Sequence, residues 1–226
     1  MARIDWAEAR RYLGLHRPGG VVDEALEQLL ERWGRELEQT ARPRAVWRRF
    51  PLQLEADGME LAGMSIPSRH LRRHLNGCTG AYLFAATLGA EVDRLIRRCA
   101  VTEVSAAVVC QACAASLLEA YCDECGGRIA GEVAEEGLWL RPRFSPGYGD
   151  FSVDFQPALL AALEAQKRIG LTASQARMLI PTKSVTAVIG LSPDPTCRPG
   201  GCASCGKTDC AFRRTDVTPQ NPTQGS

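Results

Sequence analysis

The stretch RPRFSPGYGDF, residues 141–151, carries the most information about this chain. Pro146, Gly147, Gly149 and Asp150 are typical turn residues: proline presets its backbone angle, glycine accepts positive φ, and aspartate bonds to nearby amides. We therefore expect a strand that ends in a tight turn. Arg143 and Tyr148 lie before and within this turn. On the local pattern alone, a structural turn is the simplest interpretation.

Helical and strand patterns lie on both sides of this stretch. Upstream, residues 104–124 (VSAAVVCQACAASLLEAYCDE) predict a long helix rich in small residues, which we expect Gly126-Gly127 to interrupt. Downstream, residues 156–170 predict a helix with proline at its start and glycine at its end. Residues 176–192 (ARMLIPTKSVTAVIGLS) predict one or two strands.

The N-terminal half mixes both patterns. Helices are expected over residues 4–13, 21–41, 68–77 and 90–99, a hairpin over 46–66 with its turn at Asp57-Gly58, and a buried strand within 80–89. Because strands and helices do not alternate regularly, the sequence predicts an α+β fold, with an antiparallel twisted sheet and flanking helices.

Composition limits the partners and the compartment. The 226 residues include 27 Lys+Arg and 26 Asp+Glu, a net charge of +1, so no global field favours nucleic acid or a membrane surface. The N-terminus MARIDWAEARRYLG lacks the apolar core of a signal peptide, and we expect a cytoplasmic protein. Its ten cysteines should stay reduced there, which favours metal ligation over disulfides.

Taken together, Arg143-x-x-x-Gly147-Tyr148 resembles the R-x-x-x-G-Y signature of one family, the S-adenosylmethionine-binding activation domain of cobalamin-dependent methionine synthase. SLLEAYCDECGGRI (116–129) is similar to that family's long helix, and Glu119 falls on its ligand-binding glutamate. MLIPTKSVTAVIGLSPD (178–194) resembles its Met-x-Pro-x-x-Ser-Val strand, and IDW (4–6) its opening. The resemblance covers about residues 75–192, and it is closer still to free-standing proteins that share RFSPGYGD.

The resemblance implies an activation-domain-like fold and a set of ligand contacts. Arg143 would hold the ligand carboxylate, Glu119 and Asp5 its ammonium group, and Tyr148 its sulfonium or adenine. Gly147 would let the backbone approach the ligand. No residue need act as a general acid or base. The chain has no room for cobalamin, folate or homocysteine modules, so we do not expect it to make methionine by itself.

After the last strand the chain departs from the family, whose Tyr-Tyr segment is replaced by Cys197-x4-Cys202-x2-Cys205-x4-Cys210. Four thiolates on a Gly/Pro-rich loop indicate a metal site. Zinc would be structural, and an iron-sulfur cluster, which we favour, could pass an electron. We interpret Cys110, Cys113, Cys122 and Cys125 as small core residues. The expected organisation is a domain over 1–192, a Cys-rich metal loop over 193–214 and a disordered tail over 215–226.

These features lead to one functional hypothesis and two alternatives. The hypothesis is an accessory protein that binds S-adenosylmethionine and helps reactivate the cobalamin of a partner, which is a corrinoid protein or a methionine synthase lacking its own activation domain. An electron donor would be a further partner. The first alternative is an iron-sulfur electron-transfer protein for corrinoid reduction. The second is a zinc-stabilised binding or regulatory module without catalysis.

Overall fold

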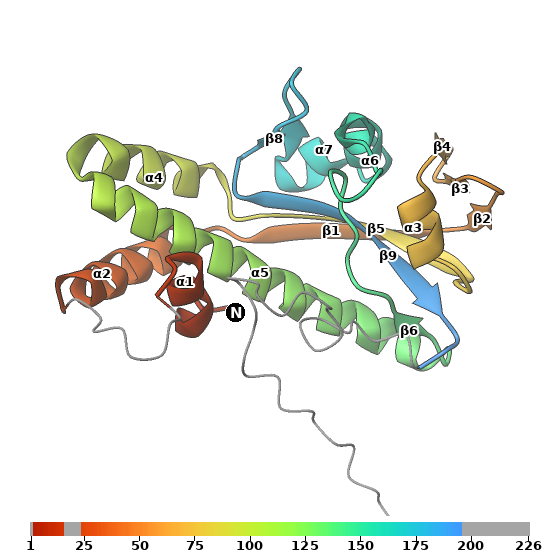
Figure 1. The fold of residues 1–226 in the computed structure, drawn as a ribbon, viewed down its shortest axis with the longest axis horizontal. Coiled ribbons are helices and arrows are strands. Elements are labelled where there is room, and N and C mark those ends of the chain that lie inside the picture. Colours follow the sequence, from red (N-terminus) through yellow and green to blue (C-terminus); the bar gives the residue numbers. More distant parts are fainter. Residues whose placement is uncertain (1, 16–23, 196–226) are drawn as a thin grey trace, which may run out of the picture.

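The computed structural model describes residues 2–15 and 24–195 (Figure 1). The helices are α1 (Trp6–Tyr12), α2 (Glu24–Thr40), α3 (Arg69–His74), α4 (Ala90–Thr102), α5 (Val104–Ala134), α6 (Gln156–Ala162) and α7 (Ala165–Ile169). The strands are β1 (Arg44–Phe50), β2 (Leu52–Leu54), β3 (Met59–Leu61), β4 (Met64–Ile66), β5 (Gly80–Thr87), β6 (Trp139–Leu140), β7 (Thr172–Ala173), β8 (Leu179–Ile180) and β9 (Ser184–Ser192).

A four-stranded antiparallel sheet, in the order β1-β5-β9-β6, forms the centre of the fold. Its middle strand β5 is buried along its whole length, as its apolar sequence predicts. β9 pairs with β5 over eight residues and with β6 at its C-terminal end, where Leu191 lies opposite Leu140. The predicted α+β class with an antiparallel sheet is therefore confirmed.

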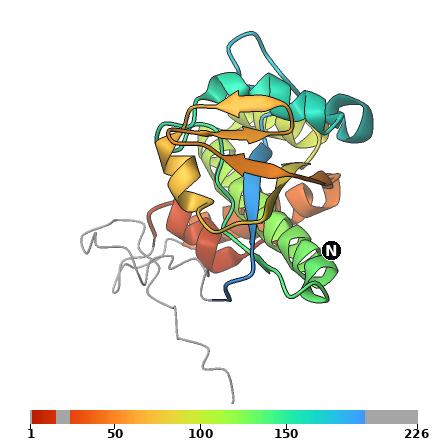
Figure 2. The same ribbon diagram turned by 90° about the vertical axis from the view of Figure 1, so that its right-hand side faces the viewer.

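The sheet separates two hydrophobic cores because successive side chains of a strand point to opposite faces. Tyr82 and Phe84 of β5 pack with α1, α2, α4 and α5, whereas Leu83 and Ala85 pack with α3, α6, α7 and the small β2-β3-β4 sheet. The two layers are visible on opposite sides of the central strands in Figures 1 and 2. The candidate site lies on the α5 side.

The long helix α5 differs from its prediction. We expected Gly126-Gly127 to end it near Glu124, but it continues to Ala134. Ile129 and Val133 are fully buried beyond the glycines, at helical spacing from Cys122 and Cys125. Burying them outweighs the cost of about 1 kcal/mol for each internal glycine.

Two further predictions need correction. The expected hairpin over 46–66 divides: β2 and β3 do turn at Asp57-Gly58, but β1 instead pairs with β5 in the central sheet. A second turn at Ala62-Gly63, both with positive φ, connects β3 to β4. The expected helix over 156–170 is two helices, because Glu164 adopts a left-handed backbone conformation between α6 and α7.

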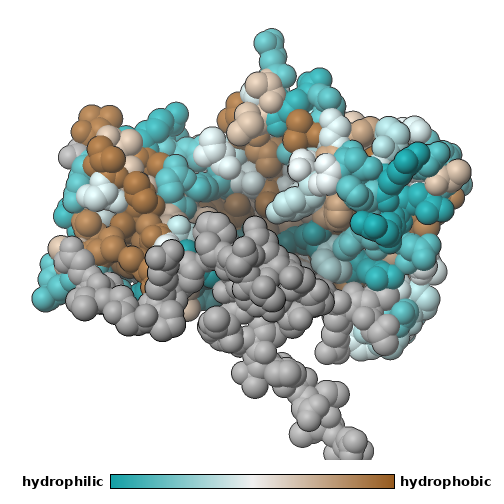
Figure 3. Space-filling model, in the orientation of Figure 1, coloured by the Kyte–Doolittle hydropathy of each residue, from teal (hydrophilic) through white to brown (hydrophobic). Residues whose placement is uncertain are grey.

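Exposed apolar side chains gather where α4 meets α5. Val101, Val104 and Val108 are 89%, 74% and 55% exposed, and this end of the molecule is strongly apolar in Figure 3. Within the described residues, α5 is long and apolar enough to cross a membrane, but half of its apolar window is buried inside the fold. That burial is typical of a core helix packed by other elements.

Candidate functional site

Arg143 lies at the centre of a cluster of charges between α5 and the chain that follows β6. Residues 141–144 continue beside β9: the amide of Arg141 donates to the carbonyl of Gly190, and Phe144 exchanges two backbone hydrogen bonds with Val188. This pairing directs Arg143 towards α5. Its Nη2 donates to Oε2 of Glu119 at 2.7 Å and its Nη1 to Oδ1 of Asp123 at 2.8 Å.

A hollow of about 440 Å³ surrounds this cluster. Its lining comes from α5 with Glu119, Asp123 and Gly126, from β9 with Val185 and Ile189, from β6 with Leu140, and from the stretch after β6 with Arg141, Pro142, Arg143, Ser145 and Tyr148. The α5 residues share one face because they are spaced by four and then three positions. The hollow therefore combines one ionic end with an apolar wall from Leu140, Val185 and Ile189.

The Arg143 guanidinium stays charged although three quarters of its side chain is buried. Burial by itself would lower the pKa of Arg143, but the neighbouring Cys122, Glu119 and Asp123 raise it above its ordinary value. Burial raises the pKa of the Cys122 thiol to about 12, so that thiol is neutral at pH 7. Glu119 and Asp123 are therefore the groups that hold the charge.

The turn after Arg143 presents Tyr148 at the mouth of the hollow. Gly147 has φ of +97°, and its amide donates to the carbonyl of Phe151 at 2.7 Å, which closes the turn. The Tyr148 side chain is 61% exposed, and its ring meets that of Phe144 edge-on, with 6.1 Å between the ring centres. Gly147 itself is not among the residues that line the hollow.

Asp150 attaches this turn to α3. Its carboxylate accepts hydrogen bonds from the Ser68 hydroxyl at 2.5 Å and from the amides of Arg69 and His70 at 2.9 and 3.1 Å. It therefore adds to the Ser68 cap at the start of that helix. Gly149 has φ of +56°, and a Cβ there would approach His70 Nδ1 to 2.3 Å. Glycine at 149 thus allows α3 to pack closely against the turn.

Asp5 has a structural use in this chain. Its Oδ1 accepts from the amides of Ala7 and Glu8, at 3.0 and 3.1 Å, and caps α1. Its backbone carbonyl accepts from the Ser116 hydroxyl at 2.8 Å, which places it beside α5 one turn before Glu119. Asp5 does not line the hollow, and its ligand contact stays a prediction.

The four clustered cysteines, Cys197, Cys202, Cys205 and Cys210, lie outside the described residues, and so do most of the predicted metal loop and all of the predicted tail. Across residues 2–15 and 24–195, no three His, Cys, Asp or Glu side chains are placed to hold a metal ion. Cys110, Cys113, Cys122 and Cys125 are buried core residues, as interpreted from the sequence.

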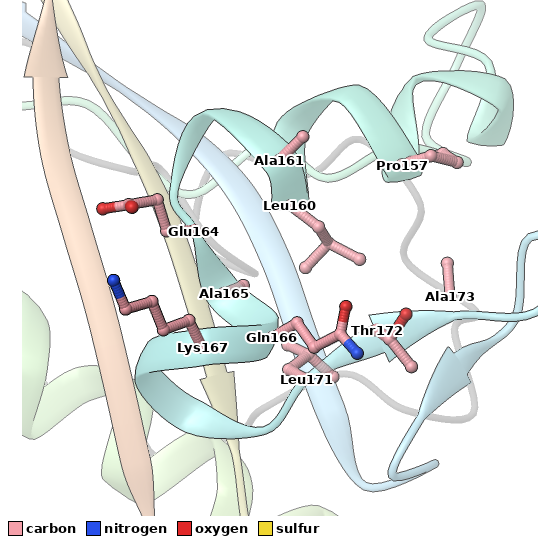
Figure 4. Close-up of a pocket in the computed structure, with 10 residues that line it drawn as sticks. All are labelled: Pro157, Leu160, Ala161, Glu164, Ala165, Gln166, Lys167, Leu171, Thr172 and Ala173. Atoms are coloured by element: carbon pink, nitrogen blue, oxygen red, sulfur yellow. The ribbon is translucent and has the colours of Figure 1, made fainter.

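A second hollow, of about 540 Å³, lies between α6, α7 and β7 (Figure 4). Apolar side chains such as Leu160 and Leu171 form much of its lining. Its carboxylate, Glu164, is paired with Arg168 at 2.9 Å. None of the predicted ligand residues is there, so we take the hollow around Arg143 as the candidate site.

Sequence reasoning found three residues of this hollow, Arg143, Glu119 and Tyr148, but missed Asp123 and Gly126. Asp123 follows Glu119 by four residues, so helical spacing alone could have placed it on the same face. Gly126 was interpreted as a helix end. A Cβ at this position would meet no atom within 4 Å, because the residue faces open space.

Comparison with known proteins identifies the fold of the chain. No known family profile matches the chain, and no curated protein sequence matches it. Among solved structures, the chain is similar to the MetH reactivation domain bound to AdoHcy, with a TM-score of 0.59 and 18% sequence identity. The alignment covers 84% of this chain and 74% of that one. The chain therefore has the fold of the MetH reactivation domain, as the sequence resemblance implied.

Proposed function

We propose that this protein binds S-adenosylmethionine in the hollow around Arg143 and uses it to help remethylate a corrinoid cofactor carried by a partner protein. The observation that carries the proposal is the Arg143 guanidinium, held between two carboxylates in an apolar-walled hollow. The chain also shares its fold with a domain that was solved with AdoHcy, the demethylated form of the same ligand.

The charges and shape of the hollow suit this ligand. S-adenosylmethionine has an α-carboxylate, an α-ammonium and a sulfonium at one end and a flat adenosine at the other. Arg143 can donate to the carboxylate, since a guanidinium has five N–H donors in a planar fork that matches a carboxylate. Glu119 can receive a cationic group, and Leu140, Val185 and Ile189 offer apolar area to the adenosine. A volume of about 440 Å³ falls in the usual range for small-ligand sites.

Tyr148 supports the same assignment from the mouth of the hollow. Its exposed ring packs edge-on against Phe144 and lines the hollow, where it could contact the sulfonium or the adenine. An aromatic face attracts a cation by about 0.5–2 kcal/mol. Because this ring is solvent-exposed in the free chain, it is also available to a partner's cofactor that approaches the ligand.

The chemistry needs proximity more than acid or base catalysis. Corrinoid Co(II) gains one electron to become Co(I), which takes the methyl group from the sulfonium and leaves S-adenosylhomocysteine. The reduction is unfavourable, and methyl transfer pulls it forward. The protein's contribution is to hold the sulfonium methyl in line with cobalt. We propose a cytoplasmic corrinoid protein, or a methionine synthase without its own activation domain, as the partner.

The iron-sulfur and zinc alternatives depend on Cys197, Cys202, Cys205 and Cys210, and they stay predictions. An iron-sulfur cluster held by these cysteines would receive the electron from a protein donor. Zinc would hold the loop together. Neither role changes the expected binding of S-adenosylmethionine by Arg143.

Remethylation of a corrinoid protein tests the function. The purified chain is mixed with a Co(II) methionine synthase fragment that lacks its activation domain, together with a low-potential chemical reductant, and the visible spectrum reports the cobalt state. We expect faster methyl-cobalamin formation when S-adenosylmethionine is added, and loss of this acceleration in Arg143→Ala. Equal rates with and without S-adenosylmethionine would favour the electron-transfer alternative. The absence of any acceleration would favour the binding module.

A further inference from the structure

Asp123 provides the hollow with a second carboxylate, next to Glu119, that can bind a cationic group of the ligand. Its Oδ1 accepts from Arg143 Nη1 at 2.8 Å, and it lines the same hollow as Glu119, one helical turn away on α5. Its side chain is 70% exposed, compared with 41% for Glu119. Asp123 is therefore the more accessible of the two carboxylates, and the one that an incoming ligand meets with the least desolvation.

The carboxylate that the sequence resemblance assigned to this role is engaged elsewhere. Asp5 Oδ1 receives the amides of Ala7 and Glu8 at the start of α1, which satisfies donors that a helix end leaves unpaired. The cap commits Oδ1 of Asp5 and holds this carboxylate at the start of α1. Asp123 has no such capping role, and its ion-pair partner, Arg143, is the residue that the ligand also binds.

We propose that Asp123, in place of Asp5, receives the α-ammonium group of the ligand by an exchange of ion pairs. The inference rests on the proposed function. When the ligand binds, its α-carboxylate takes Nη1 of Arg143, and the released Asp123 carboxylate takes the α-ammonium. One ion pair is replaced by two, so Arg143, Asp123 and both charges of the ligand's amino-acid end each have a partner. Asp123 thereby makes the site specific for ligands with a zwitterionic amino-acid end.

Arg141 also lines the hollow, but it takes no part in this exchange of ion pairs. Its Nη2 donates to the carbonyl of Asn76 at 2.8 Å, at the α3 side of the connecting stretch. Burial lowers the pKa of the His74 imidazole, on α3, and the nearby charge of Arg141 lowers it further. The Arg141 guanidinium thus has its hydrogen-bond partner on the α3 side, whereas Glu119 and Asp123 pair with Arg143.

Two neutral thioethers separate this role from any effect of the sulfonium. S-adenosylhomocysteine has the amino-acid end, and 5′-methylthioadenosine has the same nucleoside without it. In the full chain, Asp123→Asn should weaken binding of S-adenosylhomocysteine by about threefold to tenfold, the scale for a charged contact at a partly exposed site. Binding of 5′-methylthioadenosine should not change. Asp123→Glu should recover part of the loss, and thermal melting confirms that each variant is folded.

Asp5→Asn is the matched control. Because asparagine caps a helix about as well as aspartate, this variant should stay folded, and its affinity for S-adenosylhomocysteine should stay at the wild-type value. The inference is overturned if Asp123→Asn leaves that affinity unchanged or increases it, if both thioethers lose the same factor, or if Asp5→Asn causes the loss instead. Those results would leave the proposed function standing, provided that the wild type binds S-adenosylmethionine in an Arg143-dependent way. A wild type that binds none of these ligands would overturn both.

Discussion

At the scale of single residues, Asp150 connects the candidate site to the rest of the fold. Its carboxylate is hydrogen-bonded by the Ser68 hydroxyl and by the amides of His70 and Arg69, and these bonds lower the pKa of Asp150 to about 2. The carboxylate is also close to the imidazole of His70, with 3.6 Å between Oδ1 and Nδ1. The bonds fix the turn that carries Tyr148 against α3.

The lowered pKa gives a pH prediction. A carboxyl group whose pKa is lower in the folded than in the unfolded state stabilises the fold above its unfolded pKa, and this stabilisation is lost as pH falls. We therefore expect the wild type to lose stability between about pH 4 and pH 2 more steeply than Asp150→Asn does. Urea unfolding at a series of pH values measures both slopes, with Glu135→Gln, an exposed carboxylate, as the control. Equal slopes for the wild type and Asp150→Asn would contradict this role.

Only part of this residue-level arrangement could be predicted from the sequence. Arg143, Glu119 and Tyr148 fall on motifs of the family that the sequence resembles, so the resemblance identified them as a group. The cap that Asp150 provides joins residues about 80 positions apart, and no local pattern reports such a contact. The use of Asp5 as a cap could have been predicted, because aspartate before a helix is a common N-cap.

At the scale of elements, the site depends on the full length of α5. The sequence prediction ended this helix at the glycines because glycine disfavours helices locally. The buried residues Ile129 and Val133 keep it helical, and the continued helix brings Gly126 to the hollow. Local propensity was therefore overruled by tertiary packing, which a single sequence does not report.

This arrangement predicts that two glycines of α5 affect different properties, Gly131 the stability of the fold and Gly126 the binding of the ligand. Gly131 is exposed and a Cβ there meets no atom within 4 Å, so Gly131→Ala should stabilise the fold by about 0.5–1 kcal/mol and leave ligand binding unchanged. Gly126→Leu should project its side chain into the hollow, where it would compete with bound S-adenosylmethionine for the same space and weaken binding by about 1–3 kcal/mol, the scale for overpacking. Chemical denaturation and calorimetry measure the two effects. Unchanged affinity in Gly126→Leu would show that the ligand does not occupy this part of the hollow.

At the scale of the whole molecule, fold class was easier to predict than strand order. The irregular mixture of helices and strands was enough to indicate α+β with an antiparallel sheet. The order β1-β5-β9-β6 depends on pairings such as Arg44 with Thr87 and Tyr82 with Ile189, which join distant parts of the chain. One such long-range pairing is that of β1 with β5, which takes the place of the predicted pairing of β1 in the hairpin over 46–66.

The central claim for the whole molecule is that Arg143 holds S-adenosylmethionine in the hollow beside α5. Calorimetric titration of the wild type and Arg143→Ala with S-adenosylmethionine tests it most directly, with Arg168→Ala, a change at an exposed ion pair outside the hollow, as the control. We predict binding that is weakened by about 2–4 kcal/mol in Arg143→Ala and unchanged in Arg168→Ala, because the charge-assisted contact to the ligand carboxylate is lost in the first variant. Equal affinity of a folded Arg143→Ala and the wild type, or no binding by the wild type, would contradict the account.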